Sequence, residues 1–176
     1  LYPLNQLMLE RNDINKLINY LNSNKLGEAR KEQLIHAKMM RKVHKNLKRN
    51  FPPSRSGKYI KKQASEFADM ITIQWLRFNH KQFLKNFKND IEKLIFEIFL
   101  SVRTFAYTIF YKYYLQNREP DKPSDFGDLF HVFYIPYCKL AIMERELCNV
   151  LNQIKVDSDI LNNVKIRNIE FFKNWK

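Results

Sequence analysis

Apolar residues recur at helical spacing through most of the chain. In residues 1–24 they recur every three, four or seven positions, which predicts an amphipathic helix that ends in a polar segment before Gly27. A second helix is predicted over residues 28–49, with an apolar face formed by Ala29, Ile35, Met39, Val43 and Leu47. Residues 51–57, Phe-Pro-Pro-Ser-Arg-Ser-Gly, predict the break that ends it.

The next segment, residues 58–117, contains neither glycine nor proline and keeps its helical period throughout. We expect two long helices here, with a break within residues 79–86. A loop is predicted over residues 118–124, because Pro120 and Pro123 both lie in it.

Beyond this loop the pattern changes. Helices are predicted over residues 124–134, 144–154 and 169–175, and short apolar strands over residues 139–143 and 163–167. Alternation of helix and strand is typical of an α/β unit. The predicted fold class is therefore mainly α with a small C-terminal α/β portion.

Composition supports one compact unit with two parts. The chain has 176 residues, of which 45% are hydrophobic, and this excludes a disordered protein. Only three glycines are present, too few for the many turns of a β-sandwich or barrel. We expect a helical region over residues 1–123 and an α/β portion over residues 124–176.

The charge balance indicates a polyanionic partner. Lysine and arginine total 31 against 18 aspartate and glutamate, a net charge of +13, which favours nucleic acid. Two cysteines are too few for a disulfide framework, so a reducing, cytoplasmic location is expected. The most apolar stretch, residues 94–115, contains Glu97, Arg103 and Lys112, so we expect neither a membrane span nor a membrane partner.

Acidic residues of the last third form a candidate catalytic set. Asp128 and His131 share a helix face, Asp125 precedes them by one turn, and Glu144 follows a predicted strand. Carboxylates in such positions can hold Mg²⁺ or Mn²⁺ and activate water against a phosphodiester. The alternative is structural: Asp125 and Asp128 then stabilise a helix N-terminus, and Glu144 caps the next helix.

The segment that contains these acids, Ser-Asp-Phe-Gly-Asp-Leu-Phe-His-Val-Phe-Tyr-Ile-Pro-Tyr-Cys-Lys-Leu-Ala-Ile-Met-Glu-Arg, resembles the C-terminal half of PIN-like metal-dependent ribonucleases. The resemblance covers residues 124–176. It implies a Rossmann-like half-domain with a large helical insertion, residues 26–117. It also implies that Asp128 and Glu144 bind the metal, that Asp125 supports them, and that His131 contacts them or the substrate. No strand in residues 1–24 matches the family's opening acidic strand, so the implied function is an endoribonuclease or a fragment of one.

The second helix is a candidate nucleic-acid interface. Basic residues dominate it and continue past the break, and they predict salt-sensitive phosphate binding, with RNA as the expected ligand. The predicted contacts are Lys38, Arg41, Lys42, Lys45, Lys48, Arg49, Arg55 and Lys58. A solvated helix face is the alternative, and a non-catalytic RNA-binding or assembly module, with a protein partner or a second copy, also stays open.

A third pattern involves histidine. Arg30 and His36 resemble the Arg-x(4–6)-His motif of HEPN ribonucleases, which are helical and need no metal. His44 and His80 have no metal-ligand spacing with other residues and are expected at the surface or at helix caps. A HEPN-like ribonuclease is therefore a further alternative function.

Overall fold

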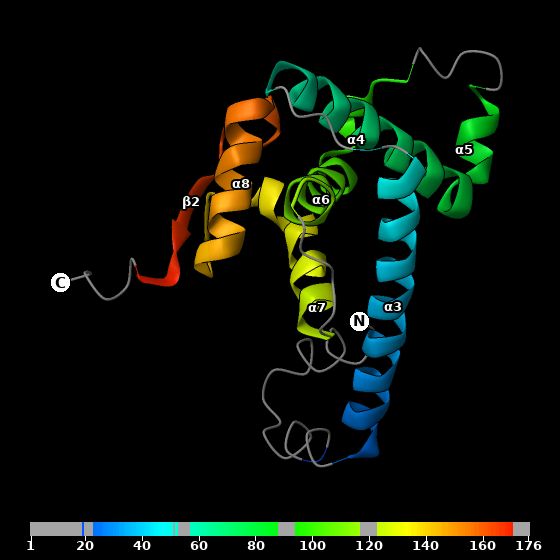
Figure 1. Cartoon of the computed structure of the whole chain (residues 1–176), viewed down its shortest axis with the longest axis vertical. Helices are drawn as coiled ribbons and strands as arrows, with labels where there is room; N and C mark the ends of the chain where they lie inside the picture. The colour runs from blue at the N-terminus through cyan, green and yellow to red at the C-terminus, as the bar shows by residue number, and fades with distance from the viewer. Residues whose placement is uncertain are drawn as a thin grey trace.

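The computed structural model describes residues 19, 23–50, 52, 57–87, 94–116 and 123–170 (Figure 1). The predicted first and last helices lie almost wholly outside these residues. The helices and strands follow one another in this order: α3 (Asn24–Asn50), α4 (Gly57–Asn79), α5 (Lys81–Lys85), η2 (Phe96–Ile98), α6 (Leu100–Ile109), η3 (Phe110–Tyr114), α7 (Pro123–His131), η4 (Val132–Tyr137), β1 (Leu140–Met143), α8 (Arg145–Asp157), η5 (Asp159–Leu161) and β2 (Lys165–Asn168).

Helix α3 confirms the helix predicted over residues 28–49, and α4 confirms the first of the two helices predicted within residues 58–117. Of the predicted break between them, residues 51–57, only Pro52 and Gly57 lie among the described residues. The second long helix of the Gly-free and Pro-free segment is shorter than predicted, because α6 begins only at Leu100. Ile95 has an extended backbone there, and a single 3₁₀ turn, η2, precedes α6. Helical periodicity therefore continues through a segment whose backbone is not continuously helical.

Helix α6 is the centre of the molecule, with α4, α7 and α8 around it (Figure 1). Ala64 and Ala68 of α4 and Ala106 of α6 are fully buried, and their small side chains let the two helices pack closely. Two buried threonines, Thr104 and Thr108, donate their hydroxyls to carbonyls four residues earlier. The central helix thus buries polar residues without leaving these hydroxyls unpaired.

The π-helical segment η3 continues α6, and all five of its residues are buried. Its rings pack on α4, with the ring centroids of Phe67 and Phe110 5.6 Å apart. One hydrophobic cluster contains residues of both predicted parts of the chain, from Ala64 of α4 to Ile166 of β2.

The predicted C-terminal strands are confirmed. β1 and β2 pair in parallel, with Leu140 opposite Lys165, and α8 connects them as the helix of a βαβ unit. The fold is mainly α with this small α/β portion, as predicted. None of the helices in the described ranges is both long and apolar enough to cross a bilayer.

One residue of the apolar face predicted for α3, Ile35, does not lie on its inward side. Ile35 is 56% exposed, whereas Ala37 and His44 are buried against the rest of the fold. Helix α3 contacts α7 and η3 on this side. Ala37 lies inward because its side chain is small, and His44 lies inward because it bonds to the Tyr113 carbonyl of η3. The side chains of Met39 and Val43 lie outside the description, as do those of Ala29 and Leu47.

Candidate functional site

A buried lysine lies at the junction of η3, α7 and α8. The Lys112 side chain is 1% exposed, and its Nζ lies 3.9 Å from a carboxylate oxygen of each of three acids. Asp125 and Asp128 come from α7, and Glu146 comes from the first turn of α8. We call these four residues the Lys112 cluster.

The acids of this cluster are exposed to different degrees. The Asp125 side chain is 3% exposed, whereas those of Asp128 and Glu146 are 36% and 35% exposed. The Lys112 ammonium makes no hydrogen bond within the described part of the chain and lies 5.5 Å from the centroid of the Tyr113 ring. The buried charge of Lys112 is therefore balanced by the three carboxylates, of which that of Asp125 is itself buried, and by the face of the Tyr113 ring.

The cluster contains two of the four predicted catalytic residues. Asp125 and Asp128 lie in it, but Glu144 is exposed as the N-cap residue of α8, and His131 is exposed at the end of α7. Glu146 faces the lysine in place of the predicted Glu144, because the helix begins between the two residues and directs them differently.

The carboxylates of the cluster do not fit a divalent metal ion in this arrangement, since an ammonium lies among them. In the part of the chain that the structure describes, no three His, Cys, Asp or Glu side chains are grouped to hold a metal. Binding of Mg²⁺ or Mn²⁺ by Asp128 and Glu144 stays a prediction.

The predicted basic face of α3 is largely exposed. Lys38, Arg41, Lys42, Lys45 and Arg49 are exposed, and Lys48 is half-buried. We define the basic stripe by exposed residues that follow one another at intervals of seven, four, three and four positions: Lys31, Lys38, Lys42, Lys45 and Arg49. Side chains at such intervals lie along one side of a helix.

Sequence adds one further property of this region. Residues 33–65 contain ten lysines and arginines and no aspartate or glutamate. Lys38, Lys42 and Arg49 accordingly form no ion pair within the described residues. These three charges of the stripe are therefore not neutralised within the described part of the chain.

Two side chains attach α3 to the end of η3. His44 Nε2 lies within hydrogen-bond distance of the Tyr113 carbonyl, and Lys48 donates to the carbonyl of Gln116. The expectation that His44 lies at the surface is therefore wrong: it is 5% exposed and connects α3 to η3. These contacts hold the C-terminal half of the basic helix against the core.

Some predicted residues cannot be placed. Arg55 lies outside the described residues, and so do the side chains of Lys58, Arg30 and His36. The HEPN-like pairing of Arg30 with His36 therefore stays a prediction.

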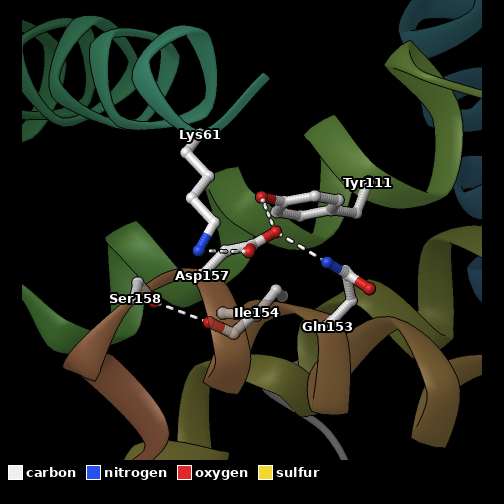
Figure 2. Close-up of polar contacts among 6 residues, drawn as sticks. All are labelled: Lys61, Tyr111, Gln153, Ile154, Asp157 and Ser158. Atoms are coloured by element: carbon white, nitrogen blue, oxygen red, sulfur yellow. Dashed lines mark hydrogen bonds and ion pairs between the residues drawn. The ribbon is translucent and has the colours of Figure 1, made fainter. Parts of the chain in front are cut away.

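A second polar cluster surrounds Asp157 at the end of α8 (Figure 2). Lys61 reaches down from α4 to within 3.0 Å of one carboxylate oxygen. Tyr111 and Gln153 each donate to the other oxygen at 2.7 Å. These contacts connect α4, η3 and α8 through one carboxylate.

Protonation of this second cluster follows from its contacts. Burial by itself would raise the pKa of Asp157, but hydrogen bonds from Gln153, Tyr111 and Lys61 more than offset it and hold that pKa below its usual value. Burial, and then the bond to Asp157, raises the pKa of Tyr111 far above its usual range. Tyr111 is therefore a neutral donor and Asp157 a charged acceptor at neutral pH.

Sequence reasoning missed Lys112, Glu146 and Asp157. The signal for Lys112 was present: a single charged residue within the run Phe-Ala-Tyr-Thr-Ile-Phe-Tyr-Lys-Tyr-Tyr must be buried with a partner. Glu146 and Asp157 are eleven residues apart on one face of α8, but the helix predicted over residues 144–154 ends before Asp157.

Comparison of the chain with models of protein families, with curated proteins and with solved structures gives no significant match.

Proposed function

We propose that this protein binds the phosphate backbone of RNA through the basic stripe of α3. The observation that supports this proposal is a row of exposed basic residues on a helix segment that contains no acid between Gln33 and Asn50. From Lys31 to Arg49 the row extends about 27 Å at 1.5 Å per residue. A row of this length can contact several successive phosphates.

The mechanism is neutralisation of phosphates with release of condensed counterions. Such binding reads no base sequence and weakens as salt is added. Side chains of the stripe extend from a rigid helix that His44 and Lys48 fix to the core, so the strand meets a preformed row of charges.

The test neutralises three stripe residues that form no ion pair within the described residues, in the variant Lys38→Gln/Lys42→Gln/Arg49→Gln. The matched control, Lys81→Gln/Lys85→Gln/Lys139→Gln, removes the same charge at exposed positions on α5 and before β1. Affinity for a labelled single-stranded RNA is measured by fluorescence polarisation across a range of salt concentrations.

We expect the stripe variant to bind roughly tenfold to a hundredfold more weakly than wild type. The slope of log affinity against log salt concentration should become less steep by about 2, since each phosphate contact contributes about 0.7 to that slope. The control should retain both values. Equal loss in the two variants would mean that total charge, rather than the stripe, determines binding.

Metal-dependent hydrolysis of RNA is the second candidate: Asp128, which the PIN-like resemblance implies as a metal ligand, lies in the Lys112 cluster with Asp125, which it implies as a support. A metal ion at this position would have to displace the Lys112 ammonium that lies among the acids. Incubation of labelled single-stranded RNA with Mn²⁺, with and without EDTA, tests it. Cleavage that EDTA and Asp128→Asn both abolish supports the nuclease. Binding without cleavage under every condition contradicts it and leaves the stripe as the functional feature.

A further inference from the structure

A pocket of about 600 Å³ opens between α4, η3 and α8. Its volume lies within the range of small-molecule and cofactor sites. Tyr111 and Val150 are buried and form its apolar part, whereas three amide side chains, Gln116, Asn149 and Gln153, are exposed and form its polar rim. An apolar interior with a polar rim suits a flat ligand that has polar edges.

The charges of the pocket limit what can enter it. Two carboxylates line it, those of Glu146 and Asp157, and each already pairs with a lysine, Lys112 and Lys61 respectively. The lining thus offers no unpaired cation to attract a phosphate group. The ligand group that enters is therefore uncharged or cationic.

The amides of the rim supply hydrogen bonds of both kinds. Within the described residues, the side-chain amides of Asn149 and Gln116 have no partner, and Gln153 uses only its NH₂ group, on Asp157. An amide side chain both donates and accepts, as the edge of a nucleobase does. The pocket therefore offers apolar side chains and unused amides to one heteroaromatic group.

The pocket adjoins the end of the basic helix. Gln116 lines the pocket, and its backbone carbonyl accepts a hydrogen bond from the ammonium of Lys48 on α3. Lys61 lies at the opposite, α4 side of the pocket. The pocket thus lies next to the C-terminal half of α3, and its lining offers no unpaired cation to a phosphate.

We propose that this pocket receives one unpaired nucleobase of an RNA strand whose phosphates lie on the basic stripe. The inference rests on the proposed function and adds the substrate class, single-stranded RNA. In a duplex the base must first be unpaired and unstacked, at a cost on the order of a few kcal/mol. The protein should therefore bind duplex RNA more weakly than single-stranded RNA.

The experiment compares wild-type protein with Asn149→Leu, which removes the amide at an exposed position without a change of charge. Asn152→Leu is the matched control, since Asn152 is exposed on the same helix and does not line the pocket. Fluorescence polarisation measures binding of three probes of equal length: single-stranded RNA, duplex RNA and an abasic strand with the same number of phosphates.

We expect wild-type protein to bind single-stranded RNA about tenfold more tightly than the abasic strand, because only the former has a base to bury in the apolar interior of the pocket. Asn149→Leu should weaken binding of single-stranded RNA about fivefold, the worth of one hydrogen bond, and leave the abasic strand and the duplex unchanged. Asn152→Leu should behave as wild type.

Two failures are distinguishable. If single-stranded RNA and the abasic strand bind equally and Asn149→Leu changes neither, the pocket proposal is overturned while binding by the stripe stands. If no probe binds wild-type protein, both proposals are overturned.

Discussion

Lys112 and the lysines of α3 carry the same ammonium group in opposite environments. Lys112 is buried on η3 with three carboxylates at 3.9 Å, whereas Lys38 and Lys42 are exposed on a helix segment without acids. The first charge is neutralised by the protein itself. The second is exposed to solvent and, in the proposed function, to RNA.

This difference shows why the net charge of +13 says little about any one residue. Depriving a buried ion of its partners costs on the order of several kcal/mol. The acids around Lys112 therefore serve first to balance the charge of its ammonium. An exposed lysine interacts weakly with its own protein, so its charge stays available to ligands. Mutations should therefore separate the two regions, one by its effect on stability and the other by its effect on binding.

The largest expected effect is that of Lys112→Met on stability. Removal of the ammonium leaves the Asp125 carboxylate buried without its counter-charge, which should lower the free energy of unfolding by about 3–5 kcal/mol. Urea denaturation measures it. Lys61→Met is the control: Lys61 also pairs with a buried aspartate but is itself 53% exposed, and without it Asp157 keeps its hydrogen bonds from Tyr111 and Gln153, so the variant should cost about 1 kcal/mol. Equal losses in the two variants would contradict the comparison.

The next largest effect is that of Asp157→Asn, which should cost about 1–2 kcal/mol at neutral pH, because charged acceptors make the stronger hydrogen bonds. Folding lowers the pKa of Asp157 from its ordinary value of 3.8. Its stabilising contribution is therefore complete above that pH and is lost as the pH falls through the lower folded-state pKa. Urea midpoints of wild type and variant should converge as the pH falls below 3.8. A constant difference at every pH would show that the ionised carboxylate is not responsible.

A smaller effect separates two neighbouring glutamates. Glu146→Gln removes one counter-charge of Lys112 and should cost about 1 kcal/mol, whereas Glu144→Gln alters an exposed side chain and should stay within about 0.5 kcal/mol. Thermal unfolding of both variants measures the difference. The reverse order would favour the acid set predicted from the sequence.

The smallest effect on stability is expected for Lys38→Gln/Lys42→Gln/Arg49→Gln. These side chains form no ion pair in the described residues, so the free energy of unfolding should change by less than about 0.5 kcal/mol. Unfolding in urea, at the salt concentration of the binding assay, checks it. A loss of several kcal/mol would show that the stripe stabilises the fold.

Sequence periodicity predicted the helices α3, α4 and α8 and both strands, because each has a clear start, end or apolar run. It was wrong for Ile35 of α3, which is exposed, and it did not place Ala37 and His44 inward, although both are buried. Apolar spacing cannot anticipate that a histidine is buried by a hydrogen bond to a backbone carbonyl of η3.

The candidate sites were predictable to different extents. Charge along α3 is a local property, so the sequence placed most of the stripe correctly. The Lys112 cluster depends on how η3, α7 and α8 meet, and on a π-helical segment that has no sequence signal of its own. The sequence therefore indicated Asp125 and Asp128 as candidates, but it indicated neither Lys112 nor Glu146.

The central claim is that α3 presents its charges to RNA while the core neutralises the charge of Lys112. Acetylation of lysines in the native protein, with and without single-stranded RNA, followed by mass spectrometry, tests both halves at once. We expect Lys38 and Lys42 to react in the absence of RNA and to be protected by it, Lys81 and Lys85 to react in both states, and Lys112 to react in neither. Protection confined to lysines outside α3, or rapid acetylation of Lys112 in the folded protein, would contradict this account.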